Sequence, residues 1–188
     1  MNTVEPIRDK RKLEKMKKFL KDKSLRDYTL FVTGINSGLR ISDLLSLKLA
    51  DVYEAGAVKS RVTVKEQKTG KTRDFPLSDT ARKALYEYIL QLPLSKQPED
   101  FLFRSRKGGS LTRTQAYRII NHAAHIAGID ERIGTHTLRK TFGYHAYQQC
   151  QDLSLIMKIL NHSSEAVTLR YIGITKEDCD KVYMNLNL

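Results

Sequence analysis

The sequence has no tryptophan, only two cysteines and no long run of apolar residues. A membrane-spanning helix needs about 20 consecutive, mostly apolar residues, and no stretch comes near that length. The first residues, MNTVEPIRDKRK, lack the apolar core of a signal peptide. Cys150 and Cys179 are too few for a disulfide framework, so we interpret both as packing residues in a reducing compartment. These absences together predict a cytoplasmic protein.

The motifs of nucleotide and metal chemistry are also missing. The chain contains no GxxxxGK[ST] loop and no cluster of carboxylates that could hold Mg²⁺. His122 and His125 are three residues apart on a predicted helix, but no further ligand stands nearby, so we expect no zinc. The sequence therefore predicts a protein that works without a metal or any other cofactor.

What the chain has in excess is positive charge. Its 33 Lys and Arg residues exceed its 21 Asp and Glu residues, which gives a net charge of +12 and a pI near 9.7. Such an excess favours a polyanionic partner, and nucleic acid is favoured over a membrane because no basic amphipathic helix flanks a long apolar run. The alternative is a basic surface that serves only solubility. With 188 residues, 40% of them hydrophobic, the chain can bury one substantial core.

Capping residues and apolar periodicity predict a mainly helical, α+β fold. Residues that favour helix N-termini precede segments with apolar side chains at helical spacing. Between residues 57 and 77 the pattern changes to the alternation of a β-strand, a turn at KTGK and a returning strand, which predicts an antiparallel hairpin with Lys68 and Lys71 at its tip. The predicted helix caps are Asp9, Ser24, Ser78, Thr112, Asp152 and Thr175.

Two basic segments in the second half of the chain are candidates for contacts with nucleic acid. The glycine-containing loop RSRKGGS includes Arg106 and Lys107, and the helix opened by Thr112 begins with the polar, basic turn TRTQ, which includes Arg113. A first turn of this kind offers side chains and free backbone amides to phosphates. These four residues are the predicted DNA contacts, although ordinary solvated loop residues would have the same composition. The same helix is expected to bury Tyr117 with other apolar residues.

Several polar residues carry little information when they are taken singly. Tyr171, in LNHSSEAVTLRYIGI, would by itself be a half-buried aromatic residue of a helix. His136 and Arg139 share a helix face at i, i+3 spacing, as many surface pairs do. Arg40, at the head of LRISDLLSLKL, and Lys68, in the hairpin turn, would each have an ordinary structural explanation.

Taken together and in order, these segments resemble the catalytic domain of the tyrosine recombinases, the phage integrase family. The resemblance rests on SGLRISDLLSL, VKEQKTGKTRDFPLSD, HTLRKTF, LNHSS and TLRY, and it reaches from about the second helix to Tyr171. It implies a site-specific recombinase or integrase that cuts DNA through a 3′-phosphotyrosyl intermediate. The residues that it implies for the site are Tyr171 as nucleophile, Arg40 and Arg139 as phosphate-binding residues, Lys68 as general acid, and His136 and His162 near the phosphate.

The chemistry of strand cleavage explains why such residue types are needed. Attack on a phosphodiester places charge on the nonbridging oxygens, which the planar guanidinium groups of two arginines bind bidentately without a metal. The tyrosine, with an ordinary pKa near 10, must lose a proton, and a nearby imidazole can accept or relay it. The departing 5′-oxygen needs a proton, which a lysine gives up more easily than an arginine.

Two departures from the family pattern qualify these expectations. Asn161 stands where a glycine is common, but asparagine tolerates left-handed backbone, so the turn should survive. Family members usually carry a separate N-terminal DNA-binding domain, and only about two dozen residues precede the second helix here. Residues 1–188 are therefore expected to form a single catalytic domain, with the basic first helix and the short tail helix included.

The expected partners are double-stranded DNA and further copies of this chain. Cleavage of four strands in two pairs would need a tetramer in the synaptic complex, and accessory DNA-binding proteins are a further expected partner. The segment after Tyr171 could dock on a neighbouring copy or pack against the body of its own chain. Two other functions stay open at this point: a relaxing enzyme similar to type IB topoisomerases, and a DNA-binding protein that keeps the fold without cutting.

Overall fold

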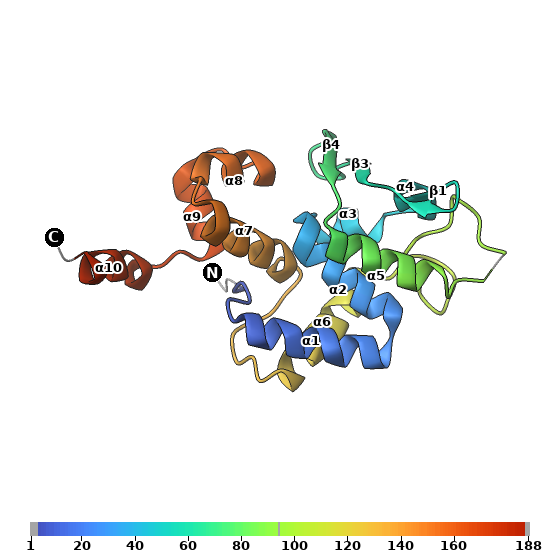
Figure 1. Cartoon of the computed structure of the whole chain (residues 1–188), viewed down its shortest axis with the longest axis horizontal. Coiled ribbons are helices and arrows are strands. Elements are labelled where there is room, and N and C mark those ends of the chain that lie inside the picture. Colours follow the sequence, from blue (N-terminus) through green and yellow to red (C-terminus); the bar gives the residue numbers. More distant parts are fainter. Residues whose placement is uncertain (1–3, 94, 187–188) are drawn as a thin grey trace.

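A computed structural model describes residues 4–93 and 95–186 and shows a mainly helical chain with two small antiparallel sheets (Figure 1). This agrees with the predicted α+β class. No helix of the described part is long and apolar enough to cross a membrane. The elements are α1 (Lys10–Lys23), α2 (Leu25–Ser37), α3 (Ile41–Leu45), α4 (Leu49–Val52), β1 (Tyr53–Glu54), β2 (Ala57–Val58), β3 (Arg61–Lys65), β4 (Thr72–Pro76), α5 (Asp79–Ile89), α6 (Arg113–Ile126), α7 (Thr137–Cys150), α8 (Leu153–Leu160), α9 (Glu165–Ile172) and α10 (Lys176–Asn185).

The predicted caps begin the helices as expected. The Asp9 carboxylate accepts hydrogen bonds from the amides of Arg11 and Lys12, and so satisfies donors that α1 cannot pair internally. At the start of α6, Thr112 and Gln115 exchange both bonds of a capping box. The predicted caps Ser24, Ser78, Asp152 and Thr175 likewise precede α2, α5, α8 and α10.

Gly38 ends α2 in the left-handed conformation, with φ of 61°. Any other residue would be strained there, and a Cβ atom at this position would lie 2.5 Å from the Phe142 ring of α7. The glycine therefore allows the end of α2 and α7 to pack closely. The chain then turns into α3, whose N-cap residue is Arg40.

The β-hairpin is formed by β3 and β4, with Val62 opposite Phe75 and Lys65 opposite Thr72. Val62 and Phe75 are buried, whereas most of their strand neighbours are exposed, which is the alternation that the sequence predicted. The predicted range of 57–77 was too long, because Ala57–Val58 pairs instead with Tyr53–Glu54 in a sheet of its own. This short pairing has too few residues to show a periodic signal.

Buried apolar residues form one large and one small cluster. The large cluster lies among α1 to α6, the strands and the start of α7. The small cluster consists of Ile156, Leu160 and Ile172, with Phe142 and Tyr171 among the partly buried residues packed against it. Figure 1 shows α8 and α9 beside the outer part of α7, to one side of the larger body. Helices α8 and α9 therefore pack around a small core of their own.

Two side chains differ from the expected burial. Tyr117 is 40% exposed because Ala116 takes the buried position in the first part of α6, whereas Ile120, Ala123 and Ala124 are buried as predicted. Cys150 is exposed at the end of α7 and is not a packing residue. The side chain of Cys179 lies outside the described residues.

Candidate active site

Arg139 lies in the first turn of α7 and is only 2% exposed. Its guanidinium donates one hydrogen bond to the carbonyl of Gly38 (2.7 Å) and another to the carbonyl of Leu160 (2.6 Å). Burial lowers its pKa, but a guanidinium remains charged at any physiological pH. Arg139 therefore connects the end of α2 to the end of α8 and places a fixed positive charge between them.

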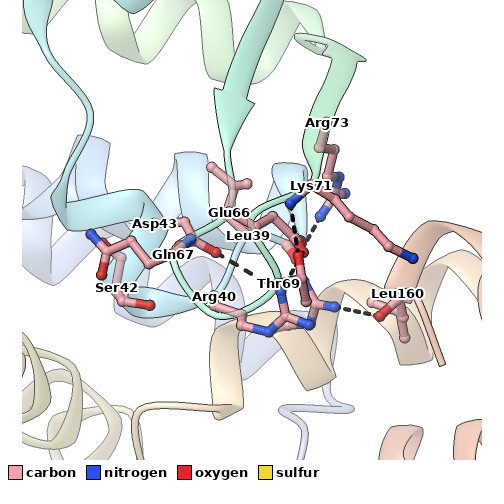
Figure 2. A network of polar contacts seen from close by, with 12 residues as sticks. Leu39, Arg40, Ser42, Asp43, Glu66, Gln67, Thr69, Lys71, Arg73 and Leu160 are labelled. Atoms are coloured by element: carbon pink, nitrogen blue, oxygen red, sulfur yellow. Dashed lines mark hydrogen bonds and ion pairs between the residues drawn. The ribbon is translucent and has the colours of Figure 1, made fainter.

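Arg40, the N-cap residue of α3, forms an ion pair of 2.7 Å with the buried carboxylate of Glu66 (Figure 2). The same carboxylate accepts a hydrogen bond of 2.7 Å from the Thr69 hydroxyl in the hairpin turn. Burial by itself raises the pKa of Glu66, but the bonds from Thr69 and Arg40 outweigh it and leave the pKa below its ordinary value. Glu66 is therefore ionised and holds the Arg40 side chain against the hairpin.

The carboxylate of Asp43 supports the same corner from α3. It is buried and accepts a hydrogen bond of 2.9 Å from the backbone amide of Gln67, beside the Lys68 position in the hairpin turn. Its other oxygen lies 4.0 Å from the Arg40 guanidinium. Asp43 thus fixes the hairpin turn relative to α3, and Figure 2 shows Asp43, Gln67 and Arg40 close together.

Arg73 of β4 is a further cation of this corner, half-buried, that the sequence did not indicate. It donates to the carbonyls of Ser37 (2.7 Å) and Gly38 (3.3 Å), and burial lowers its pKa to about 10. Its effect is to hold the hairpin against the end of α2.

Glu66 had a weak signal in the sequence, since it continues the inward alternation of Val62 and Val64. That pattern normally predicts a buried apolar residue and not a buried acid.

Next to these strands is a cleft of about 540 Å³ between the hairpin and the end of α8. Its lining includes Glu66, Arg73 and Asn161, and the Lys71 ammonium reaches the Asn161 side chain at 3.4 Å. Asn161 adopts the left-handed conformation with φ of 49°, as predicted for this turn. The turn directs the chain from α8 to His162.

His162 contacts the Tyr171 ring edge to face, with 4.7 Å between the ring centres. Its Nδ1 atom lies 3.2 Å from the Thr168 hydroxyl, which itself donates to the Ser164 carbonyl. Because the proton of Thr168 is used in that bond, Nδ1 of His162 must be the donor and Nε2 keeps a free lone pair. Burial, together with the charges of nearby arginines, lowers the pKa of His162 to about 4, so the ring is neutral.

Tyr171 lies in the last turn of α9, and its hydroxyl is buried without a hydrogen-bond partner among the described residues. Burial raises the pKa of this hydroxyl, although the charges of Arg139 and Arg40 act in the opposite direction. The His136 ring centre is 6.5 Å away, and the ammonium of the buried Lys140 lies 5.3 Å from the centre of the Tyr171 ring. An unpaired buried hydroxyl is costly, which is typical of a functional group awaiting a ligand.

His136 precedes α7 as its N-cap residue. Its pKa is lowered by burial and then by four nearby cations, which are Arg139, Lys140, Lys68 and Arg113. Lys68 of the hairpin turn and Arg113, the first residue of α6, therefore both disfavour the protonated form of His136. Lys68 is exposed and makes no hydrogen bond or ion pair within the described residues.

Of the predicted DNA contacts, Arg106 and Lys107 are exposed in a turn closed by the pairing of Arg104 with Ser110. Thr112 has a structural task, because its hydroxyl and amide form the cap of α6. Only Arg113 acts electrostatically on a residue of the predicted site. Four of the predicted site residues contact Tyr171 or act on it electrostatically, namely His136, His162, Arg139 and Arg40, whereas Lys68 acts on His136 from the hairpin turn. The four predicted DNA contacts are spread along the adjoining loop and helix end.

The N-terminal segment also reaches this site, which the sequence did not suggest. The Arg8 guanidinium donates a hydrogen bond of 2.6 Å to the Gly173 carbonyl, at the end of α9. The buried amide of Ile7 donates to the Thr141 hydroxyl of α7 at 2.9 Å, and the Ile7 carbonyl lies 2.9 Å from Nε2 of His145. Residues 4–9 therefore connect α7 with the end of the helix that carries Tyr171.

A mainly helical domain with a β-hairpin, in which arginines, histidines and a buried tyrosine meet, is the architecture of a tyrosine recombinase catalytic domain. The chain belongs to the phage integrase family, whose sequence profile matches residues 8–178. It is 43% identical over 184 residues to the "Probable integrase/recombinase YoeC" of Bacillus subtilis (strain 168), with 97% of each chain covered. It is also 33% identical to "Tyrosine recombinase XerD" of Corynebacterium glutamicum, over 85% of this chain but only 52% of that protein.

Solved structures share the fold at lower identity. The crystal structure of XerA recombinase has a TM-score of 0.79 and 23% identity, over 99% of this chain and 68% of that one. XerH bound to palindromic difH substrate, in a post-cleavage complex, has a TM-score of 0.75 and 24% identity, over 98% of this chain and 54% of that one. The chain therefore spans about half of XerD and XerH, and nearly all of YoeC.

Proposed function

We propose that this chain is a site-specific recombinase that cuts and rejoins DNA strands, with Tyr171 as the nucleophile. The observation that carries the proposal is the buried, unpaired Tyr171 hydroxyl beside neutral His162 and within the field of Arg139 and Arg40. A phosphodiester at this point would meet a nucleophile, a proton acceptor and two fixed cations. Membership of the phage integrase family and the likeness to YoeC support the same activity.

In the first step the Tyr171 oxygen attacks phosphorus, and the bond from phosphorus to the 5′-oxygen breaks. The phenolic proton passes to the free Nε2 of His162, because the other ring nitrogen is committed to Thr168. Arg40 and Arg139 stabilise the charge that develops on the nonbridging oxygens. Lys68, exposed on the hairpin turn, gives a proton to the departing 5′-oxygen. A second 5′-hydroxyl reverses these steps and releases the tyrosine.

His136 occupies a different position from His162. It faces Tyr171 across a longer ring distance and is surrounded by cations that disfavour its protonated form. We assign it a hydrogen bond to the phosphate rather than the transfer of the tyrosine proton. Arg106, Lys107, Thr112 and Arg113 would contact the flanking DNA backbone, and Arg113 is the best placed of the four because it acts on His136.

The tail helix supports a proposal about assembly. Tyr183 and Met184 of α10 are each 79% exposed, and Figure 1 shows α10 projecting from the body of the chain. Exposed apolar residues on a short helix favour docking on another surface. We place that surface on a neighbouring copy, with four copies on two DNA sites. Lambda integrase, which shares the fold, was crystallised as a dimer bound to a COC′ core site. Accessory proteins and a cytoplasmic location stay predictions.

Residues 1–188 are proposed to act as one catalytic domain, which the coverage of YoeC supports. A topoisomerase-like enzyme would use the same covalent step but would relax supercoiled DNA at one protein per plasmid. The recombinase should instead exchange strands between paired sites and show a steep dependence on protein concentration. Relaxation without exchange would favour the topoisomerase.

The direct test is recovery of a covalent protein–DNA adduct that survives denaturation. Because the target sequence is unknown, the protein is incubated with sheared DNA of its source organism, and protein-linked fragments are isolated and sequenced. Tyr171→Phe should abolish the adduct but preserve DNA binding. Tyr86→Phe, at an exposed tyrosine of α5, is the matched control and should retain it. An adduct that persists in Tyr171→Phe would refute the assignment, and its absence from the unaltered protein would refute the activity.

A further inference from the structure

Helix α1 carries half of the net charge of the protein. Its sequence, KRKLEKMKKFLKDK, contains eight Lys or Arg residues and two acidic residues, Glu14 and Asp22, which gives +6 out of a total of +12. The remaining 174 residues of the 188 share the other +6. None of the residues assigned above to cleavage lies on this helix, so the catalytic chemistry does not account for its charge.

These charges lie on one exposed face. Helix α1 packs on α2 and α6 through the buried residues Leu13, Met16 and Leu20. Its opposite side exposes Lys10, Arg11, Lys15 and Lys18, which are here called the α1 basic face; Glu14 lies among them and pairs with Lys17. Within the described residues these four make no ion pair, whereas Lys12, Lys17 and Lys21 each have an acidic partner. The α1 basic face is therefore free to meet an external anion.

The charges also stand at an unfavourable place along the helix. The first turn contains Lys10, Arg11 and Lys12 and no acidic residue, although the positive end of the helix dipole lies there. A cation at a helix N-terminus is unfavourable in the absence of an anion, because it faces the positive end of the helix dipole. Solubility can be supplied by charges anywhere on the surface, so it does not explain this position. The Asp9 carboxylate already caps the amides of Arg11 and Lys12, so an external anion would meet the side-chain cations and reduce their mutual repulsion.

We infer that the α1 basic face is a second DNA-binding surface, which grips the phosphate backbone of double-stranded DNA away from the catalytic residues. Figure 1 places α1 on the opposite side of α2 from the β3–β4 hairpin. With 14 residues, α1 is about 21 Å long, which matches the rise of about six base pairs of duplex. A membrane surface fits less well, because the apolar residues of α1 face the core and none is left to enter the lipid.

An acidic protein is the competing partner, but the geometry favours DNA. Four unpaired cations on one side of a helix suit the regular phosphates of a duplex, which need no matching side chains. The proposed function also brings DNA to this chain, so a second contact on the same molecule gains from its high effective concentration. The α1 basic face would supply affinity without reading sequence, and it does not depend on Tyr171 chemistry.

The test compares two variants with equal loss of charge. Lys15→Gln/Lys18→Gln removes two cations from the α1 basic face, and Arg82→Gln/Lys83→Gln removes two exposed cations from α5. Binding to a duplex of arbitrary sequence is measured by fluorescence anisotropy between roughly 50 and 200 mM salt. Loss of two phosphate contacts should reduce the slope of log K against log salt by about 1.8. The α1 variant should therefore bind more weakly than the unaltered protein. The ratio of the two affinities should be largest at the lowest salt concentration and should fall about tenfold by the highest.

The control variant should keep a slope close to that of the unaltered protein. Equal effects of the two variants would mean that only total charge matters, and no effect of the α1 variant would mean that this face does not contact DNA; either result overturns the inference. Adduct formation at saturating DNA should be unchanged in the α1 variant. The two failures can thus be told apart. The salt slopes test the α1 basic face, and recovery of the covalent adduct tests the proposed function.

Discussion

Protonation of His162 should destabilise the fold at acid pH, and the structure sets the size of the effect. The pKa of this residue is lowered from an ordinary 6.5 to about 4 in the folded chain, first by burial and then by Arg139 and Arg40. Between these two values the unfolded chain binds a proton that the folded chain does not bind. The contribution of His162 to stability is therefore complete above pH 6.5 and is lost as the pH falls toward 4.

The linkage relation gives the expected magnitude. For a shift from 6.5 to about 4, the free energy of unfolding should fall by about 2.4 kcal/mol between pH 7 and pH 4.5. His162 is only half-buried, so solvent screening reduces this value to about 1–2 kcal/mol. Replacement of the imidazole by a side chain that does not titrate should remove this part of the pH dependence.

The assay is urea unfolding of the unaltered protein and of His162→Asn at pH 7 and pH 4.5. Other groups titrate in this range, so the informative quantity is the difference between the two proteins. His125→Asn, at an exposed position of α6, is the matched control. The argument would be refuted if His162→Asn lost as much stability on acidification as the unaltered protein. It would also be refuted if the control variant had the same effect as His162→Asn.

Three other substitutions test contacts around the site. In Gly143→Ala the new methyl would lie 2.8 Å from a side chain of α9, so thermal unfolding should show a loss of about 1–3 kcal/mol, whereas Gly109→Ala, in open space, should cost far less. Glu66→Gln removes the counter-charge of Arg40 and should lower the free energy of urea unfolding by about 1–3 kcal/mol; unchanged stability would contradict the ion pair. Arg8→Gln removes the bond to the carbonyl that ends α9, so adduct formation should slow about fivefold at unchanged DNA affinity, with partial rescue by Arg8→Lys.

The sequence predicted local features of this fold well, because their causes lie within a few residues. Caps such as Asp9 and the Thr112 capping box depend only on neighbouring amides, and the left-handed turn at Asn161 depends on a single side chain. The inward alternation of Val62 was likewise visible, since it reflects the pleat of one strand. Short pairings such as β1 with β2 were missed because two residues show no period.

The supporting residues of the site could not be found in this way. Buried Glu66 and Lys140 and half-buried Arg73 look like surface charges in the sequence. Their loss of exposure follows only from the packing of the hairpin and α7 against distant helices. The contact of Arg8 with Gly173 joins residues 165 positions apart. The residues around Tyr171 were named because their order resembles a family, whereas the groups that position them required the structure.

The small core beneath Tyr171 has a consequence for motion. Only three fully buried apolar residues, Ile156, Leu160 and Ile172, hold α8 and α9 together, whereas α2 lies in a cluster about ten times larger. Amide hydrogens of α9 should therefore exchange with solvent through local opening, well before the whole domain unfolds. Phosphate bound at Arg139, whose guanidinium bonds the Leu160 carbonyl, would slow that exchange. Tyr171, the proposed nucleophile, thus belongs to a small cooperative unit that bound DNA would be expected to stiffen.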